Sequence, residues 1–250
     1  MTDGRSARHG GITAGQRVLI IVPAYNEEGS VGDVVRDILH HLPEATPVVI
    51  DDGSTDTTGE TARAAGARVI RMPFNMGIGT AVQTGFKLAE RERFDVAVQV
   101  DGDGQHPPSQ VRPLLEEMAR TDANYVIGSR FLEETSYRAP LARRGGIRLL
   151  ARLVSTVTRQ RITDTTSGLR AADSETIRLF ALHYPHDYPE VEAIVLAKRA
   201  GLTVREVVVH MKHRESGQSS ITPFKSLYYM VKVTLAVLVQ FAGRNPAGSQ

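Results

Sequence analysis

Two aspartates placed two positions apart carry the most distinctive chemistry in this sequence. Asp101 and Asp103 follow an apolar run at 96–100 and are separated by Gly102. On an extended backbone, side chains at positions i and i+2 point the same way, so both carboxylates can face one point. Such like charges repel unless a cation lies between them, and a hard divalent cation is the usual partner. The spacing indicates a Mg²⁺ or Mn²⁺ site completed by substrate phosphates, or, equally well, a polar turn between a strand and a helix.

More polar side chains stand close to this pair or after another apolar run. Gln105 and His106 come next in the chain and can supply neutral metal ligands. Asp51 and Asp52 follow the run "PVVI", where a carboxylate can accept hydrogen bonds from a base or a ribose. The segment "DDGSTD" also suits an Asx turn and a helix cap, and the binding and structural interpretations can hold together.

A third polar loop is "VPAYNEE" at 22–28. Tyr25 offers a flat face to a base, and Asn26 and Glu27 offer polar edges. Glu28 suits the N-terminus of the following helix, because a negative charge is favoured there. This loop by itself is weak evidence for a binding site.

The elements that position these loops alternate between strand and helix. Apolar β-branched runs predict strands at 17–24, 47–54, 67–72, 94–100, 124–130 and 202–211. Helical spacing predicts helices at 31–42, 55–65, 78–92, 106–121, 139–159, from about 174, and at 190–201. Ser54 or Thr55 is expected to cap the helix at 55–65, and Asp173 or Ser174 the helix that begins near 174. The segment 162–176 is interpreted as turn-rich. This alternation predicts a single α/β domain with a parallel sheet, in which the polar loops gather beyond the carboxyl ends of the strands.

Composition excludes several classes of protein. Among 250 residues, 30 Lys and Arg balance 28 Asp and Glu, and a net charge of +2 argues against a general nucleic-acid binder. The absence of Cys excludes disulfides and thiolate metal sites and is compatible with a reducing compartment. Residues 1–16 contain no apolar signal-peptide core and are expected to form a flexible tail. No stretch reaches the ~18 apolar residues of a spanning helix.

Taken together, the motifs resemble the glycosyltransferase family 2 enzymes of the GT-A fold. The resemblance covers residues 17–220 and rests on "VPAYNEE" (22–28), "DDGSTD" (51–56), "NMGIGTAVQTG" (75–85), "DGDGQ" (101–105), "VIGSRF" (126–131), "DTTSGLRA" (164–171) and "VREVVVHMKHRESGQSS" (204–220). Within that family the sequence is most similar to the dolichol-phosphate mannosyltransferase and polyprenyl-phosphate glycosyltransferase group. The resemblance implies a Rossmann-like α/β domain at 17–222, with a mainly parallel sheet flanked by helices, that transfers a sugar with inversion.

The resemblance also implies roles for individual residues. Donor-binding residues would be Pro23, Tyr25, Asn26, Glu27, Asp51, Asp52, Asp101, Gly102, Arg130 and Arg214. The metal ligands would be Asp101, Asp103 and Gln105, and the metal with the two arginines would neutralise charge that builds on the leaving nucleoside diphosphate. Each arginine taken alone is also compatible with a solvated surface charge.

Asp164 is the preferred candidate near the acceptor, where it would orient the acceptor or take its proton. A capping aspartate in a turn is an equally good interpretation. Asp187, Glu190 and Glu192 are acids in the region where many relatives place a base, and they rank below Asp164. An acceptor phosphate needs little help from a base, and Arg143, Arg144 and Arg170 are candidates for attracting it.

The late loop departs from the lipid-linked mannosyltransferases. Those enzymes typically carry Gly, Ser and Lys after the arginine, whereas this chain has "RESGQSS", with Ser220 in place of the lysine. One cationic contact is therefore missing, which leaves the donor sugar and the fit of the acceptor open.

The segment 223–243 has the pattern of an amphipathic helix, with Lys225 and Lys232 on its polar face, and 244–250 is a short tail. It suits a membrane surface or docking to a small membrane protein, and packing against the core or a second copy in a homo-oligomer fits the pattern equally well.

The sequence thus predicts a metal-dependent transferase that moves a sugar from a UDP- or GDP-linked donor to a polyprenyl phosphate, at the cytoplasmic face of the membrane. Transfer to a soluble glycan or protein is the alternative enzyme activity. A nucleotide-sugar sensor without catalysis is the alternative outside enzymes.

Overall fold

The computed structural model describes residues 15–133, 141–210 and Lys232. In this part of the chain the strands form one seven-stranded sheet in the order β3-β2-β1-β4-β6-β5-β7. The strands are β1 (Val18–Ala24), β2 (Thr46–Asp51), β3 (Arg68–Arg71), β4 (Val96–Gln99), β5 (Tyr125–Ser129), β6 (Arg170–Asp173) and β7 (Val204–Val208). Five of the six predicted strand segments begin one or two residues later than predicted, and the second begins one residue earlier, because apolar patterning locates a strand better than its ends.

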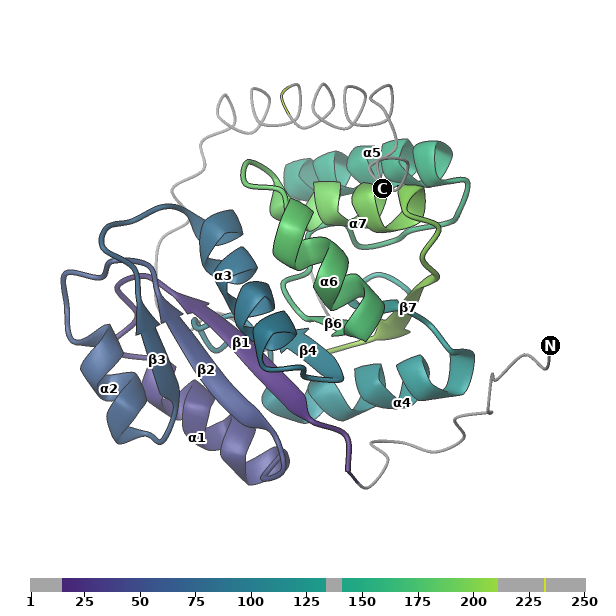
Figure 1. Ribbon diagram of the computed structural model, residues 1–250. Helices are drawn as coiled ribbons and strands as arrows, with labels where there is room; N and C mark the ends of the chain where they lie inside the picture. Colours follow the sequence, from purple (N-terminus) through teal and green to yellow (C-terminus); the bar gives the residue numbers. More distant parts are fainter. Residues whose placement is uncertain (1–14, 134–140, 211–231, 233–250) are drawn as a thin grey trace.

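Helices cover both faces of the sheet (Figure 1). The helices are α1 (Val31–His41), α2 (Thr58–Ala64), α3 (Ile78–Arg91), α4 (Val111–Thr121), α5 (Leu141–Thr158), α6 (Ser174–His183) and α7 (Pro189–Arg199), and the 3₁₀ turn η1 (Pro108–Gln110) precedes α4. One apolar core cluster joins the sheet to α1, α2 and α4, and the other joins it to α3, α5, α6 and α7. The mixed α/β layering predicted from the alternating pattern is confirmed.

The sheet is mainly parallel, as the family resemblance implies, but one strand departs from the fully parallel arrangement that the strand–helix alternation predicts. β6 runs antiparallel between β4 and β5, with Val98 and Val126 both paired to Ala171. This strand lies inside the segment 162–176 that was predicted to be turn-rich. Its four residues are too few to produce a periodic signal, and its pairing partners are distant in the sequence. The insertion brings the polar turn at 163–168 beside the end of β4.

The prediction for the start of α2 is also wrong. The helix begins at Thr58 after the N-cap Thr57, so neither Ser54 nor Thr55 caps it. Ser54 Oγ instead accepts a hydrogen bond from the Asn26 N–H at 3.1 Å. The predicted cap of α6 is confirmed, because the Asp173 carboxylate accepts from the Thr176 N–H at 2.8 Å.

An aromatic cluster fixes α3 and α6 against the sheet. Phe180 makes edge-to-face contacts with Phe86, Tyr125 and Tyr184, with ring centroids 5.1 to 5.2 Å apart. Each such pair contributes about 1 kcal/mol beyond the area it buries. The cluster lies below the carboxyl end of β4 and gives the acidic loop there a rigid base.

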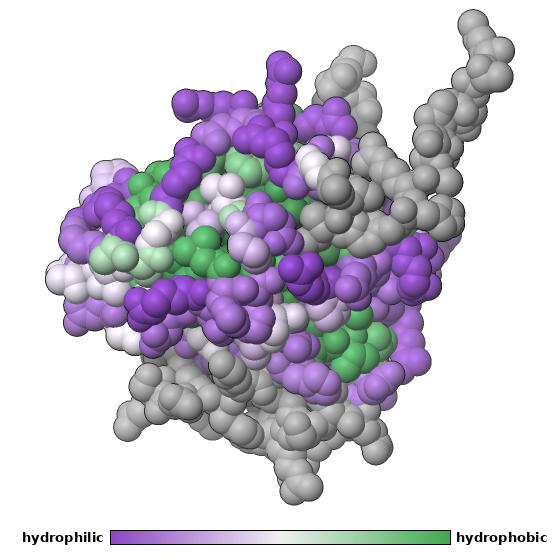
Figure 2. All heavy atoms as spheres, turned by 90° about the horizontal axis from the view of Figure 1, so that it is seen from below, coloured by the Kyte–Doolittle hydropathy of each residue, from purple (hydrophilic) through white to green (hydrophobic). Residues whose placement is uncertain are grey.

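The face seen from below carries α1 and α4 (Figures 1 and 2). Hydrophilic residues dominate this surface, with hydrophobic residues showing in two areas. This distribution is typical of amphipathic helices that bury one side against a sheet.

Candidate active site

A pocket of about 430 Å³ lies beyond the carboxyl ends of β1, β2 and β4. That volume is in the range of small-ligand sites. Its lining consists of Pro23, Ala24, Tyr25, Glu27, Asp52, Asn75, Gly77, Ile78, Ala81, Asp101, Gly102 and Asp103. Three of the polar loops identified from the sequence therefore meet here, as expected for an open α/β sheet.

The acidic pair sits on the loop after β4. The Asp103 carboxylate accepts a hydrogen bond from the Gln105 N–H at 3.0 Å, which closes an Asx turn with Gly104 at φ +73°. Burial, reinforced by the Asp103 charge, raises the pKa of Asp101 to about 6. The Asp101 Oδ1 atom is buried without a hydrogen-bond partner. The polar-turn interpretation is thus correct for Asp103, yet it leaves the Asp101 Oδ1 atom without a partner.

A glycine missed by the sequence analysis shapes the Asp101 site. A Cβ built on Gly168 would lie 2.0 Å from Asp101 Oδ2, so only glycine permits this approach. Gly168 belongs to the turn before β6. The quoted motif "DTTSGLRA" contained it, but its partner was not visible from the sequence.

His106 lies beside the pair and is 2% exposed. Its Nε2 is 3.9 Å from Asp101 Oδ2, and its Nδ1 has no hydrogen-bond partner. Burial, together with the positive charge of Arg130, lowers the pKa of His106 to about 4. The ring is therefore neutral at pH 7 and adds no positive charge beside the acidic pair.

The residues present fit a hard divalent cation. An unsatisfied carboxylate oxygen on Asp101 and a second carboxylate on Asp103 line one pocket, and the donor set is oxygen only. Within the described residues there is no cluster of three or more His, Cys, Asp or Glu side chains. Phosphate oxygens of a ligand would thus have to complete the coordination, as is common for Mg²⁺. Gln105, predicted as a third ligand, does not line the pocket.

The loop after β1 is tied to the loop after β2 by reciprocal hydrogen bonds. The Asn26 amide oxygen accepts from the Thr55 N–H at 2.9 Å, and a Glu28 carboxylate oxygen accepts from the Thr57 N–H at 3.0 Å. Asn26 has φ +54°, a left-handed conformation that Asn tolerates. The polar groups of Asn26 and Glu28 thus hold the two loops together, while Tyr25 lines the pocket and is 45% exposed.

The two aspartates at the end of β2 have different surroundings. Asp52 lines the pocket, and its two oxygens accept hydrogen bonds from the Met76 and Gly77 N–H groups at 2.8 and 2.9 Å. Asp51 Oδ1 accepts from the Ser54 N–H at 2.9 Å, and Oδ2 lies 3.6 Å from Arg71 Nε without a hydrogen bond. The Asx turn predicted in this segment is formed by Asp56, whose Oδ1 accepts from the Thr58 N–H at 2.9 Å, and Asp51 keeps one buried acceptor oxygen.

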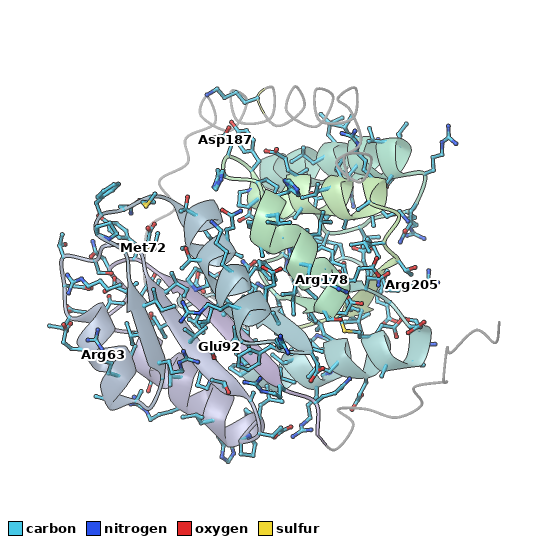
Figure 3. All side chains as sticks on the ribbon, in the orientation of Figure 1. Arg63, Met72, Glu92, Arg178, Asp187 and Arg205 are labelled. Carbon is cyan, nitrogen blue, oxygen red and sulfur yellow. The ribbon has the colours of Figure 1, made fainter. Side chains whose placement is uncertain are left out.

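The loop between β3 and α3 forms the rim of the pocket, and sequence reasoning had assigned it no individual residue. Phe74, Met76 and Ile78 are exposed large hydrophobic residues there. Figure 3 shows Met72 at the same end of the sheet, whereas Glu92 lies at the opposite end of α3. The α6–α7 loop packs closely onto α3, because a Cβ on Gly79 would lie 2.6 Å from the Pro185 carbonyl oxygen.

Arg130 follows β5 and pairs with Asp164. The guanidinium Nε lies 2.6 Å from Asp164 Oδ2, and Nη2 lies 2.8 Å from Oδ1. The side chain of Arg130 is 4% exposed and that of Asp164 is 0% exposed. Despite burial, the hydrogen bonds and charge of Arg130 hold the pKa of Asp164 below its usual value. Asp164 Oδ1 also accepts from the Thr166 N–H at 3.1 Å, so of the two interpretations left open a capping aspartate in a turn fits this geometry better than a proton acceptor.

The remaining predicted residues lie in different surroundings. Arg170 is buried and donates to Ser167 O, Thr165 O and the Tyr125 hydroxyl, which removes it from a role in attracting an acceptor. Burial raises the pKa of Glu190, whose charge also interacts with Arg170 and Asp101. Asp187 is on the exposed α6–α7 loop (Figure 3). Arg214 and, apart from Lys232, the segment 223–243 lie outside the described residues.

The fold and pocket define an α/β protein of the GT-A type with an acidic pocket at the carboxyl edge of its sheet. The Glycosyl transferase family 2 model matches residues 19–177. The chain is 32% identical to the polyprenol monophosphomannose synthase of Mycolicibacterium smegmatis, over 87% of this chain and 86% of the relative. It is also 32% identical to the undecaprenyl-phosphate mannosyltransferase of Micrococcus luteus, over 82% and 88% respectively. The chain belongs to glycosyltransferase family 2 and is a glycosyltransferase.

Solved structures agree on the fold. A mycobacterial protein superposes with a TM-score of 0.70 at 27% identity, over 94% of this chain and 78% of that one. Glucosyl-3-phosphoglycerate synthase from Mycobacterium tuberculosis, crystallised with Mn²⁺, uridine diphosphate and phosphoglyceric acid, superposes with a TM-score of 0.69 at 23% identity, over 94% and 81%. In the described part of this chain, no helix is both long and apolar enough to cross a membrane.

Proposed function

We propose that this glycosyltransferase moves a sugar from a nucleoside diphosphate sugar to a polyprenyl phosphate, with a divalent cation at Asp101 and Asp103. The observation that carries the proposal is the pocket, where these two carboxylates lie together with Tyr25 and Asp52. The functions of two relatives that align over more than four-fifths of the chain support the lipid acceptor.

The donor would lie across the pocket from β2 to β4. Tyr25 and Pro23 would pack against the base, while the free oxygen of Asp51, or the carboxylate of Asp52, accepts from the base or ribose. Glu27 and the backbone at Gly102 would border the ribose and diphosphate. Gly102 is tightly enclosed, since a Cβ there would lie 3.0 Å from the Pro23 carbonyl oxygen.

Mg²⁺ or Mn²⁺, when bound, would supply positive charge to the leaving diphosphate. Asp101 and Asp103 would hold the ion, and Arg130 would add a second positive charge from β5. Burial and the Asp103 charge raise the pKa of Asp101 to about 6, and the positive charge of Arg130 opposes that rise, so Arg130 acts electrostatically on this carboxyl. Arg214 is proposed as a further cation at the diphosphate.

A phosphate acceptor is already anionic and a competent nucleophile, so the reaction places little demand on a general base. A weak demand for a base agrees with the ion pair that already occupies Asp164. Glu190 is a second acid of this region, and its charge interacts with Asp101. The acceptor phosphate would enter on the side of β5 and α7. We place the enzyme at the cytoplasmic face of the membrane, with the segment 223–243 as its contact with lipid or a membrane partner.

The test is a transfer assay with labelled donors. UDP-glucose, UDP-N-acetylglucosamine and GDP-mannose are each incubated with Mn²⁺ or Mg²⁺ and a short polyprenyl phosphate in detergent. Metal-dependent appearance of label in the organic phase is expected for one of them. Label that stays in the aqueous phase on an added sugar or peptide indicates a soluble acceptor. Tight nucleotide binding without turnover under any of these conditions would identify a sensor.

A further inference from the structure

Glu206 connects β7 to the turn that carries Asp164. Its register partner on β5 is Ile127, three residues before Arg130. Its carboxylate accepts hydrogen bonds from the Thr163 N–H at 3.0 and 2.9 Å, from the Thr163 hydroxyl at 3.0 Å and from the Asp164 N–H at 2.9 Å. One half-buried side chain thus fixes the backbone of two consecutive residues.

The same turn determines where Arg130 lies. Asp164 accepts from Arg130 Nε, from Nη2 and from the Arg130 backbone N–H at 3.1 Å. Thr166 Oγ1 accepts a further bond from Nη2 at 2.7 Å. The Ser129 hydroxyl, next to Arg130, is 2.7 Å from the Thr163 hydroxyl. The guanidinium plane is therefore set by a turn that is itself held by Glu206.

We propose that Glu206 is a positioning residue for sugar transfer: through Thr163 and Asp164 it fixes the guanidinium of Arg130 toward the acidic pair and the donor diphosphate. The inference rests on the proposed function of the pocket. Glu206 does not touch the donor in this arrangement, and its effect on the reaction passes through Arg130.

The chemistry of the turn requires a carboxylate at this position. Two backbone N–H groups and a hydroxyl point at the Glu206 oxygens, and an ionised carboxylate is an acceptor only. In Glu206→Gln the amide oxygen can replace Oε1, which accepts from all three donors, but the NH₂ group in place of Oε2 would face the Thr163 N–H. The turn at Thr163 must then shift, and Asp164 moves with it.

A double-mutant cycle with Glu206→Gln and Arg130→Lys tests the proposal. The measured quantities are kcat for Mn²⁺-dependent hydrolysis of the nucleotide sugar by water, which needs no lipid acceptor, and Kd for uridine diphosphate with Mn²⁺. We expect kcat to fall about 100-fold in Arg130→Lys and about 10-fold in Glu206→Gln. In the double variant kcat should also fall about 100-fold, because Glu206 acts through Arg130 and has no further effect once Arg130 is replaced.

Independent effects would multiply to about 1,000-fold, and that result would overturn the proposal. Glu92→Gln, which breaks the exposed pair with Arg68 at the far end of the domain, is the matched control and should leave both quantities unchanged. Urea unfolding of every variant shows whether assays are run on folded protein. If the parent turns over no donor, the proposed function fails, and coupling in the Kd values then decides the role of Glu206.

Discussion

Arg130 and Asp164 form a buried, two-pronged ion pair, with Nε to Oδ2 at 2.6 Å and Nη2 to Oδ1 at 2.8 Å. A second donor reaches each oxygen, because the Arg130 N–H bonds Oδ2 and the Thr166 N–H bonds Oδ1. A carboxylate with both oxygens engaged in this way is a poor proton acceptor and a good anchor. The pair therefore contributes to the stability of the fold and also fixes the position of the Arg130 guanidinium.

Removing the charge of Asp164 should destabilise the protein strongly. Asp164→Asn leaves the buried Arg130 charge without its partner, which costs about 3 to 5 kcal/mol in such pairs. Urea unfolding measures this loss. Asp33→Asn is the control, because its ion pair with Arg36 is exposed and should contribute less than ~1 kcal/mol. An inactive Asp164→Asn protein of parental stability would favour the proton-acceptor role instead.

Gly168→Ala should disable the metal site although neither proposed ligand is replaced. The added methyl group would lie 2.0 Å from Asp101 Oδ2, and the carboxylate would have to turn away. We expect Mn²⁺ to lose its enhancement of uridine diphosphate binding, measured by calorimetry. Gly145→Ala is the matched control, because a Cβ at that exposed helix position meets nothing within 4 Å. Metal-enhanced binding at the parental level in Gly168→Ala would mean that the loop adapts.

Asp103→Asn should abolish metal-enhanced nucleotide binding while the fold survives. The change keeps the Asx turn to Gln105, because an amide oxygen can replace the carboxylate oxygen as acceptor. Titration of uridine diphosphate with and without Mn²⁺ measures the effect. Asp122→Asn is the control, since Asp122 caps α4 in a left-handed conformation that Asn adopts readily. An unchanged metal effect in Asp103→Asn contradicts the proposed ligand.

The two aspartates after β2 should affect ligands differently. Asp52→Ala frees the Met76 and Gly77 N–H groups, so the rim of the pocket loses its anchor and nucleotide binding weakens. Asp51→Ala should weaken binding of the whole nucleotide far more than that of pyrophosphate, because its free oxygen is proposed to read the base or ribose. Competition titrations with both ligands distinguish the roles. Equal weakening of both ligands in Asp51→Ala would make it a turn residue only.

The raised pKa of Asp101 predicts how the effect of Asp101→Asn on stability depends on pH. Because the folded-state pKa of about 6 lies above the unfolded value, the stabilising effect of its proton is present at low pH and is lost as pH rises through about 6. In the metal-free protein, Asp101→Asn should therefore raise the melting temperature at pH 7.5 by a few degrees. The difference should nearly vanish at pH 4.5. A variant less stable than the parent at pH 7.5 would contradict the pKa shift.

The sequence by itself determined the class of fold and the edge where the site lies. The apolar run before Asp101 and the one before Asp51 mark buried strands, and in an open α/β sheet such strand ends meet at one edge. The motifs indicated the family, because each motif is a short segment and the order and spacing of the motifs are visible in the sequence. The α6 cap at Asp173 was also readable, since capping depends on neighbouring residues only.

Tertiary structure decided the features that depend on residues distant in the sequence. The antiparallel β6 exists because β4 and β5 pair with it, and its four residues carry no periodic signal. The engagement of Asp164 depends on Arg130, 34 positions away, and the need for Gly168 depends on Asp101. A sequence motif identifies which side chains are polar, but only packing decides which of their atoms are already hydrogen-bonded and which, like Asp101 Oδ1, remain without a partner for a ligand.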